Sequence, residues 1–183
     1  MALLLFFCVF YMSCSKSGKP SSCSGVICEN GGYCNKGKCV CPLGYESANC
    51  GTASVAKFIN TWDVTQTIIG SNRIVPSQDS SYILFIEQSA TPTTFFINNF
   101  YGNPYYNNVI CILDTLNTSY FRFDTNDSDE GFHMINDGFY ITGGKGYITL
   151  TATDTFIIDT FYDYHKATGE IDTVAMRLTP YHF

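Results

Sequence analysis

Residues 23–50 read CSGVICENGGYCNKGKCVCPLGYESANC, so six of the nine cysteines in this chain of 183 residues fall within one short segment. A segment of this length has too little apolar surface to form a core of its own, whereas each disulfide stabilises a fold by about 2–4 kcal/mol. The segment is therefore expected to be a disulfide module that forms in an oxidising compartment. Six cysteines allow about fifteen pairings, and their spacing does not select one of them.

The residues around these cysteines resemble the EGF-like family. Gly31-Gly32-Tyr33 precedes the third cysteine, and Pro42-Leu43-Gly44-Tyr45 follows the fifth. The resemblance implies that the first cysteine pairs with the third, the second with the fourth and the fifth with the sixth. The implied disulfides are Cys23 with Cys34, Cys28 with Cys39, and Cys41 with Cys50.

The N-terminal residues predict export. Residues 2–12 form an apolar run that is far shorter than the ~20 residues needed to span a bilayer. The sequence Tyr11-Met12-Ser13-Cys14 then resembles the lipobox of bacterial lipoproteins, in which the signal is cut before a cysteine that receives lipid. This resemblance implies a signal peptide over residues 1–13 and acyl chains such as palmitate on Cys14. The alternative is an ordinary signal peptide, cleaved nearby, with Cys14 left unmodified.

A flexible tether is expected over residues 14–22, because Ser, Gly and Pro dominate the stretch after Cys14 and cannot bury apolar surface. Cys8 leaves with the signal peptide, Cys14 takes the lipid and six cysteines belong to the module. Cys111 then remains as a free thiol. It lies in an apolar run at residues 108–113, where a thiol usually behaves as a small hydrophobic group.

Residues 51–183 predict a second, all-β domain. Apolar and polar residues alternate with a period of two over residues 147–151, 155–163 and 171–178. Short apolar runs at residues 82–86, 94–97 and 109–113 suit buried strands. Turn residues separate the runs at positions 103–104, 136–138, 143–146 and 168–169. We expect eight or nine antiparallel strands in a meander, from about residue 57 to residue 178.

A meander of this size avoids exposed edges either by closing into a barrel or by forming two packed sheets, and we favour the barrel. The segment that contains Trp62 is similar to the first strand of lipocalins, although Asn60 stands where glycine is usual. The preferred interpretation of Trp62 is that it simply fills one end of the core as a large apolar side chain. The order of parts resembles a group of small outer-membrane lipoproteins of Gram-negative bacteria, with one EGF-like module and a lipocalin-like domain.

Charge separates the two parts of the chain. Residues 14–50 carry four basic and two acidic side chains, a net charge of +2, whereas residues 51–183 carry six basic and fourteen acidic ones, a net charge of −8. An acidic domain is not suited to phosphate backbones or anionic headgroups, so no nucleic acid partner is expected. Contact with the membrane should come from lipid on Cys14 alone.

Metal binding is not expected. Residues 124–131, DTNDSDEG, are rich in carboxylates, but an EF-hand loop that starts at Asp124 needs glycine at Asp129 and glutamate at Ile135. A solvated acidic hairpin tip is the preferred interpretation. The calcium-binding variety of EGF-like module carries acidic residues before its first cysteine, where this chain has Lys19-Pro-Ser-Ser22.

Catalysis and cofactors are not expected either. The chain lacks the Gly-x-Ser-x-Gly and His-Glu-x-x-His motifs, and its histidines, His133, His165 and His182, are scattered. Asp159 and Asp163 share one strand face with Phe161, which makes acid–base chemistry conceivable. A solvated sheet face, on which acidic and apolar residues alternate, is the preferred interpretation.

Aromatic residues are unusually frequent, at 16% of the chain. Adjacent aromatic residues point to opposite sides of a strand or lie in loops, so some must be exposed or line a cavity. Possible contacts with a ligand or partner are Trp62, Tyr101, Tyr105 and Tyr106. The sequence therefore predicts a non-catalytic, lipid-anchored envelope protein whose β domain binds a protein, a glycan or a small apolar ligand. The alternative is a lipocalin-like carrier of a small apolar ligand.

Overall fold

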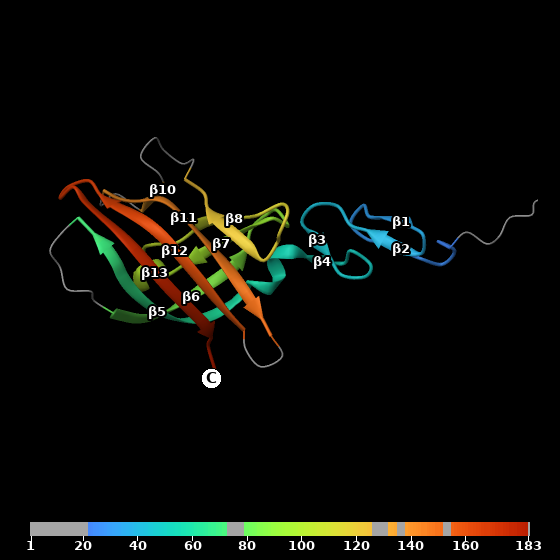
Figure 1. Cartoon of the computed structure of the whole chain (residues 1–183), viewed down its shortest axis with the longest axis horizontal. Coiled ribbons are helices and arrows are strands. Elements are labelled where there is room, and N and C mark those ends of the chain that lie inside the picture. The colour runs from blue at the N-terminus through green and yellow to red at the C-terminus, as the bar shows by residue number, and fades with distance from the viewer. Residues whose placement is uncertain (1–21, 73–78, 126–131, 135–137, 152–154, 183) are drawn as a thin grey trace, which may run out of the picture.

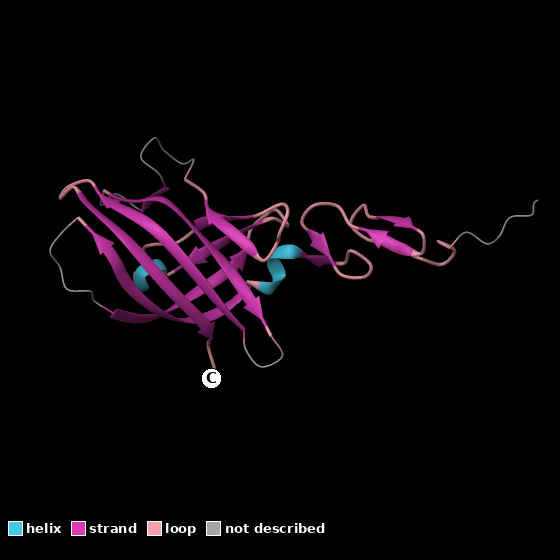
Figure 2. Ribbon diagram, viewed as in Figure 1, coloured by secondary structure: helices cyan, strands magenta, loops and turns pink. Residues whose placement is uncertain are grey.

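The computed structural model describes residues 22–72, 79–125, 132–134, 138–151 and 155–182. The chain forms a small disulfide module followed by a β-barrel (Figure 1). Strands dominate both parts, with two short 3-10 helices (Figure 2). Within the described residues, no helix is long and apolar enough to cross a membrane.

The N-terminal module consists of two small hairpins and three disulfides. The first hairpin pairs β1 (Tyr33–Asn35) with β2 (Lys38–Val40), and the second pairs β3 (Tyr45–Glu46) with β4 (Thr52–Ala53). Three disulfides join Cys23 to Cys34, Cys28 to Cys39 and Cys41 to Cys50, which are the pairs that the family resemblance implies. Most side chains of this module are exposed, so the cross-links take the place of a core.

The remaining chain forms a closed barrel of eight antiparallel strand positions, as the alternation of apolar and polar residues predicts. The strands follow chain order, and the last, β13, pairs with the first, β5. Closure occurs where β11 pairs with both β12 and β9. The short β10 pairs with the other end of β11, on the edge that β9 also uses. The strands are β5 (Asn60–Ser71), β6 (Asp79–Gln88), β7 (Thr94–Asn98), β8 (Val109–Leu113), β9 (Tyr120–Phe123), β10 (Phe132–Met134), β11 (Phe139–Leu150), β12 (Thr155–His165) and β13 (Glu170–Pro180).

Aromatic and branched side chains fill the barrel along its axis. Phe95 stacks on Phe58 with 5.0 Å between ring centroids and meets Phe121 edge-on at 5.2 Å. Further along, Phe161 lies 5.0 Å from Phe100 and 5.7 Å from Phe123. Cys111 is free and buried, as predicted, within the same core. These rings occupy the interior of the barrel.

Two 3-10 helices lie at the two ends of the barrel. Helix η1 (Ser54–Lys57) follows the module, and the chain then buries Phe58 and Trp62 at this end. The indole N–H of Trp62 donates a hydrogen bond of 2.9 Å to the carbonyl of Phe58. Helix η2 (Phe100–Gly102) belongs to the connection between β7 and β8 and lies at the opposite end of the barrel (Figure 2).

The turn expected at residues 143–146 is wrong, because these residues lie inside β11. Their glycines serve the barrel wall instead. A Cβ added to Gly144 would lie 2.6 Å from the Phe161 backbone, and one added to Gly146 would lie 2.3 Å from the Phe121 ring. A bulge between Ile141 and Gly143 shifts the register with β12. Glycine here therefore marks close packing and curvature rather than a chain reversal.

The module contacts the barrel at the η1 end. The Lys57 ammonium donates to the carboxylate of Glu46 at 2.9 Å and to the hydroxyl of Thr118 at 3.0 Å. The backbone N–H of Ser54 donates to the carbonyl of Gly44 at 2.8 Å. Gly44 has φ +88°, and a Cβ on it would lie 2.8 Å from the side chains of Pro92 and Thr93. Glycine at this position lets the module lie against the connection between β6 and β7.

Candidate functional site

The residues proposed as ligand contacts occupy opposite ends of the barrel. Trp62 is only 1% exposed at the η1 end. Tyr101, Tyr105 and Tyr106 all belong to the connection between β7 and β8, at the η2 end. The structure therefore brings the three tyrosines together and leaves Trp62 apart from them. Their contact with a ligand stays a prediction.

The connection between β7 and β8 inserts aromatic rings into the end of the barrel. Asn99 and Tyr101 both adopt left-handed backbone conformations, with φ 57° and 59°, which turn the chain inward. Phe100 is fully buried, and the Tyr101 ring lies 5.5 Å from Phe161. The Tyr101 hydroxyl donates a hydrogen bond to Asp163. We call Phe100 and Tyr101 the interior plug. Tyr105, by contrast, is 72% exposed outside it.

Three aspartates face the barrel interior, so the solvated face expected for Asp159 and Asp163 is wrong. Asp159 is 1% exposed, Asp163 3% and Asp172 6%. The strand face that carries Asp159 and Asp163 also carries Ile157 and Phe161, and it is these apolar residues that direct it inward. The alternation of apolar and polar residues predicted correctly that Asp159 and Asp163 share one strand face. It did not show that this face is turned toward the barrel interior.

Asp159 is the most unusual of these groups. Neither oxygen of its carboxyl has a hydrogen-bond partner among the described residues. Burial raises the pKa of the Asp159 carboxyl well above its usual range. Burial, together with Asp159, also raises the pKa of the nearby Tyr82, whose hydroxyl donates to the side-chain oxygen of Gln66 at 2.7 Å. Burial thus favours the neutral forms of Asp159 and Tyr82 in the barrel interior.

Metal-binding side chains do not cluster in the part of the chain that the structure describes. This part contains no group of three His, Cys, Asp or Glu side chains that could hold a metal ion. The ring of His165 contacts Thr168 at the end of β12, whereas His182 follows β13 at the other end of the barrel. His133 lies in β10, whose side chains are outside the description, as are residues 126–131 of the acidic segment.

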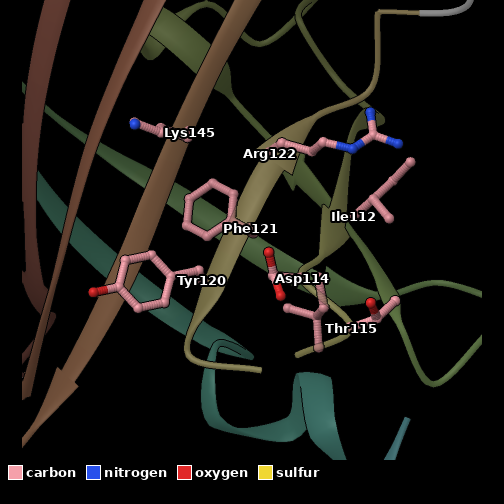
Figure 3. Close-up of a pocket in the computed structure, with 8 residues that line it drawn as sticks. Ile112, Asp114, Thr115, Tyr120, Phe121, Arg122 and Lys145 are labelled. Atoms are coloured by element: carbon pink, nitrogen blue, oxygen red, sulfur yellow. The ribbon is translucent and has the colours of Figure 1, made fainter. Parts of the chain in front are cut away.

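A hollow of about 520 Å³ lies on the barrel wall beside the hairpin of β8 and β9 (Figure 3). Phe121 and Tyr120 line its centre, with the Arg122 guanidinium on the Ile112 side and Lys145 across on β11 (Figure 3). Its lining residues are Ile112, Leu113, Asp114, Thr115, Tyr120, Phe121, Arg122 and Lys145. Apolar and cationic groups therefore border one concave surface.

Asp114 contributes the only carboxylate of this lining. One of its oxygens accepts the backbone N–H of Leu116 at 2.7 Å and that of Asn117 at 3.0 Å. The bond from Asn117, followed by that from Leu116, lowers the pKa of Asp114. The carboxylate is therefore committed to its own turn, at the edge of the hollow that leads to the module.

A second hollow, of about 220 Å³, adjoins the first and shares Tyr120 and Lys145 with it. Its other lining residues include Tyr147, Ile158 and Thr160, from β11 and β12. We call this combined surface the outer-wall site, formed by Ile112, Tyr120, Arg122, Lys145, Tyr147, Ile158 and Thr160. None of these residues stands out as a site residue in the sequence, because they meet only through the register of four strands.

Comparisons with known proteins do not assign this site. No protein-family model matches the chain, and no curated protein sequence matches it either. The role of the outer-wall site therefore follows from the chemistry of its own residues.

Proposed function

We propose that the protein is a lipid-anchored cell-envelope binding protein without a catalytic activity of its own, in which the barrel domain performs the recognition. One observation carries this proposal: aromatic side chains occupy the barrel interior, while a hollow of about 520 Å³ lies on its outer wall. Pockets for small ligands typically measure about 300–1,000 Å³, a range that includes this hollow. A barrel of this kind recognises its ligand with its surface.

Anchoring in the outer membrane through Cys14 is the second part of the proposal. It is supported by the lipobox-like residues before Cys14 and by the disulfide module, which requires export to an oxidising compartment. Each buried methylene of an acyl chain contributes about 0.8 kcal/mol of membrane affinity, and stable anchoring requires more than one chain. Lipid on Cys14 is thus sufficient to hold the protein at the membrane.

The decisive experiment is fractionation of cells that express Cys14→Ala, with Ser15→Ala as the matched control. Loss of membrane association is expected in Cys14→Ala alone. Cys14→Ala protein that still pellets with membranes would contradict the anchor and point to the folded domain as the membrane-binding part.

A carrier of a small apolar ligand is the second candidate, favoured by the closed barrel of eight strand positions. Such a barrel has an interior wide enough either for its own side chains or for one small ligand. The interior plug and at least three core phenylalanines occupy that space here, and three aspartates add polar groups to it. Trp62, at the floor of the barrel, reports on any occupant. Saturable quenching of its fluorescence by a fatty acid would favour the carrier, and we expect none.

A further inference from the structure

Strand register arranges the outer-wall site into two parallel rows. In the first row, Arg122 on β9 lies directly opposite Lys145 on β11. Ile112 and Thr160 extend this row on either side. In the second row, two residues along the strands, Tyr120 lies opposite Tyr147, and Ile158 follows on β12. A row with two cations thus runs beside a row with two tyrosines.

The cation row brings two positive side chains to one face of the barrel wall, with their charged ends on different sides of the hollow (Figure 3). Among the described residues, neither Arg122 nor Lys145 has a carboxylate within ion-pair distance, whereas Lys57 pairs with Glu46 and Arg177 covers the ring of Phe156 at 4.2 Å. The barrel domain carries only six basic side chains against fourteen acidic ones. Two unpaired cations in one hollow therefore form a local positive site on an acidic domain.

The tyrosine row supplies flat apolar surface. The rings of Tyr120 and Tyr147 lie 5.5 Å apart and are inclined at 34°. Tyr120 is 46% exposed and lines both hollows. Tyrosine offers a rigid apolar body with a polar hydroxyl, which suits ligands that are themselves partly apolar and partly hydroxylated. Thr115 and Thr160 add further hydroxyl groups around the two hollows.

We propose that the outer-wall site binds an acidic saccharide, with sugar rings lying against the tyrosine row and carboxylates meeting the cations. The Arg122 guanidinium donates two parallel hydrogen bonds to one carboxylate, and Lys145 attracts another as a point charge. Arg122 and Lys145 lie on different sides of the hollow (Figure 3), as suits charges on successive rings. The combined hollows of about 520 and 220 Å³ have room for more than one ring. This inference rests on the proposed function, in which the barrel surface performs the recognition.

Asp114 sets the direction of the bound chain. Its ionised carboxylate repels an acidic ligand at the edge of the hollow that leads to the module. Arg122 and Lys145 attract the ligand away from this edge, across β9 and β11 toward Thr160 on β12. The expected path of the saccharide therefore runs around the barrel wall and away from the module.

The test is calorimetric titration of the full-length protein in detergent with tetragalacturonic acid and, as its neutral counterpart, cellotetraose. Arg122→Gln and Lys145→Gln remove one charge each and keep side-chain length. Lys166→Gln is the matched control, an exposed lysine beyond β12. We expect saturable binding of the acidic tetramer alone, weakened about tenfold by each of the two variants and unchanged in the control. Raising the salt concentration should weaken it further.

Position of binding is measured by hydrogen exchange, with protection expected in β9 and β11. Equal affinity for cellotetraose, unchanged affinity in Arg122→Gln and Lys145→Gln, or equal competition by inorganic phosphate or polyglutamate would each overturn the acidic-saccharide proposal. Binding with protection confined to residues 99–108 would overturn the site but leave the recognition function of the barrel intact. Saturable fatty-acid binding reported by Trp62, with no saccharide binding, would instead overturn the recognition function itself.

Discussion

The module and the barrel are folded by different means. The module holds three disulfides within residues 23–50 and buries few side chains, whereas the barrel contains a continuous core of about twenty buried apolar residues and a single free cysteine. The disulfides stabilise the module by restricting its unfolded chain. The barrel is stabilised by the burial of apolar side chains in its folded state. The two parts should therefore respond to different perturbations, and the following predictions separate them in order of expected effect.

Reduction should unfold the module and spare the barrel, because the loss of each disulfide costs about 2–5 kcal/mol in a domain with almost no core. Trp62 is the only tryptophan and lies in the barrel, so its fluorescence reports the barrel alone. We expect dithiothreitol to abolish the dispersed NMR signals of residues 23–50 without shifting Trp62 emission. A red shift on reduction, in wild type and in a Cys111→Ser control alike, would show that the barrel depends on the module.

Phe95→Ala should destabilise the barrel by about 3–5 kcal/mol, because it removes a fully buried ring that packs against Phe58 and Phe121. Phe85→Ala is the matched control, since Phe85 is 43% exposed on β6. The free energy of unfolding of both variants is measured by urea titration, with Trp62 fluorescence as the signal. A similar loss in the two variants would mean that the interior is not the source of barrel stability.

Asp159→Asn should flatten the dependence of barrel stability on pH. The folded-state pKa of Asp159 is raised above the unfolded value of about 3.9, so the native state keeps a proton that the unfolded state releases. Wild-type stability therefore falls as pH rises through the window between these two pKa values, by up to about 1.4 kcal/mol per pH unit. Tyr82 and Cys111, which interact with Asp159, have raised pKa values and add to the slope only in alkaline solution.

The measurement is urea unfolding from pH 4 to pH 8 of wild type, Asp159→Asn and Asp63→Asn. Asp63 is exposed on β5 and serves as the control. An identical slope in wild type and Asp159→Asn would show that the Asp159 carboxyl titrates normally in the folded barrel.

Gly44→Ala should loosen the junction between the two parts at a cost of about 1–2 kcal/mol. The substitution places a Cβ against Pro92 and Thr93 and strains a left-handed backbone conformation. We expect faster hydrogen exchange at Ser54, whose N–H is bonded to Gly44, and an unchanged barrel melting temperature. Unchanged exchange at Ser54 would mean that the contact is not maintained in solution. Gly31→Ala, where an added Cβ meets no neighbour, controls for backbone strain alone.

The sequence predicted the general architecture well, because period-two alternation and turn residues depend only on local chemistry. It predicted the burial of Cys111 from its apolar neighbours in the same way. The predictions were wrong where the structural role of a residue depends on contacts with strands that are distant in the sequence. Glycines 143–146 were expected to form a turn, and only the rings of Phe121 and Phe161 across the barrel explain them.

The candidate site was not predictable for the same reason. The segments Tyr120-Phe121-Arg122 and Lys145-Gly146-Tyr147 each place a cation and a tyrosine on one strand face, and this much is visible in the sequence. That the two cations lie opposite each other depends on which residues of β9 and β11 pair. A shift of that register by one residue would place the partners on opposite sides of the wall.

The pairing of β5 on both edges has a mechanical consequence. A pull on the N-terminal module enters the barrel through η1 at Asn60 and runs along a strand of 12 residues held by β6 on one side and β13 on the other. Ladder hydrogen bonds lie perpendicular to the strands, so this force loads many of them in shear at once instead of peeling them apart singly. A pull applied at the N-terminus would therefore be resisted by the β6 and β13 ladders together.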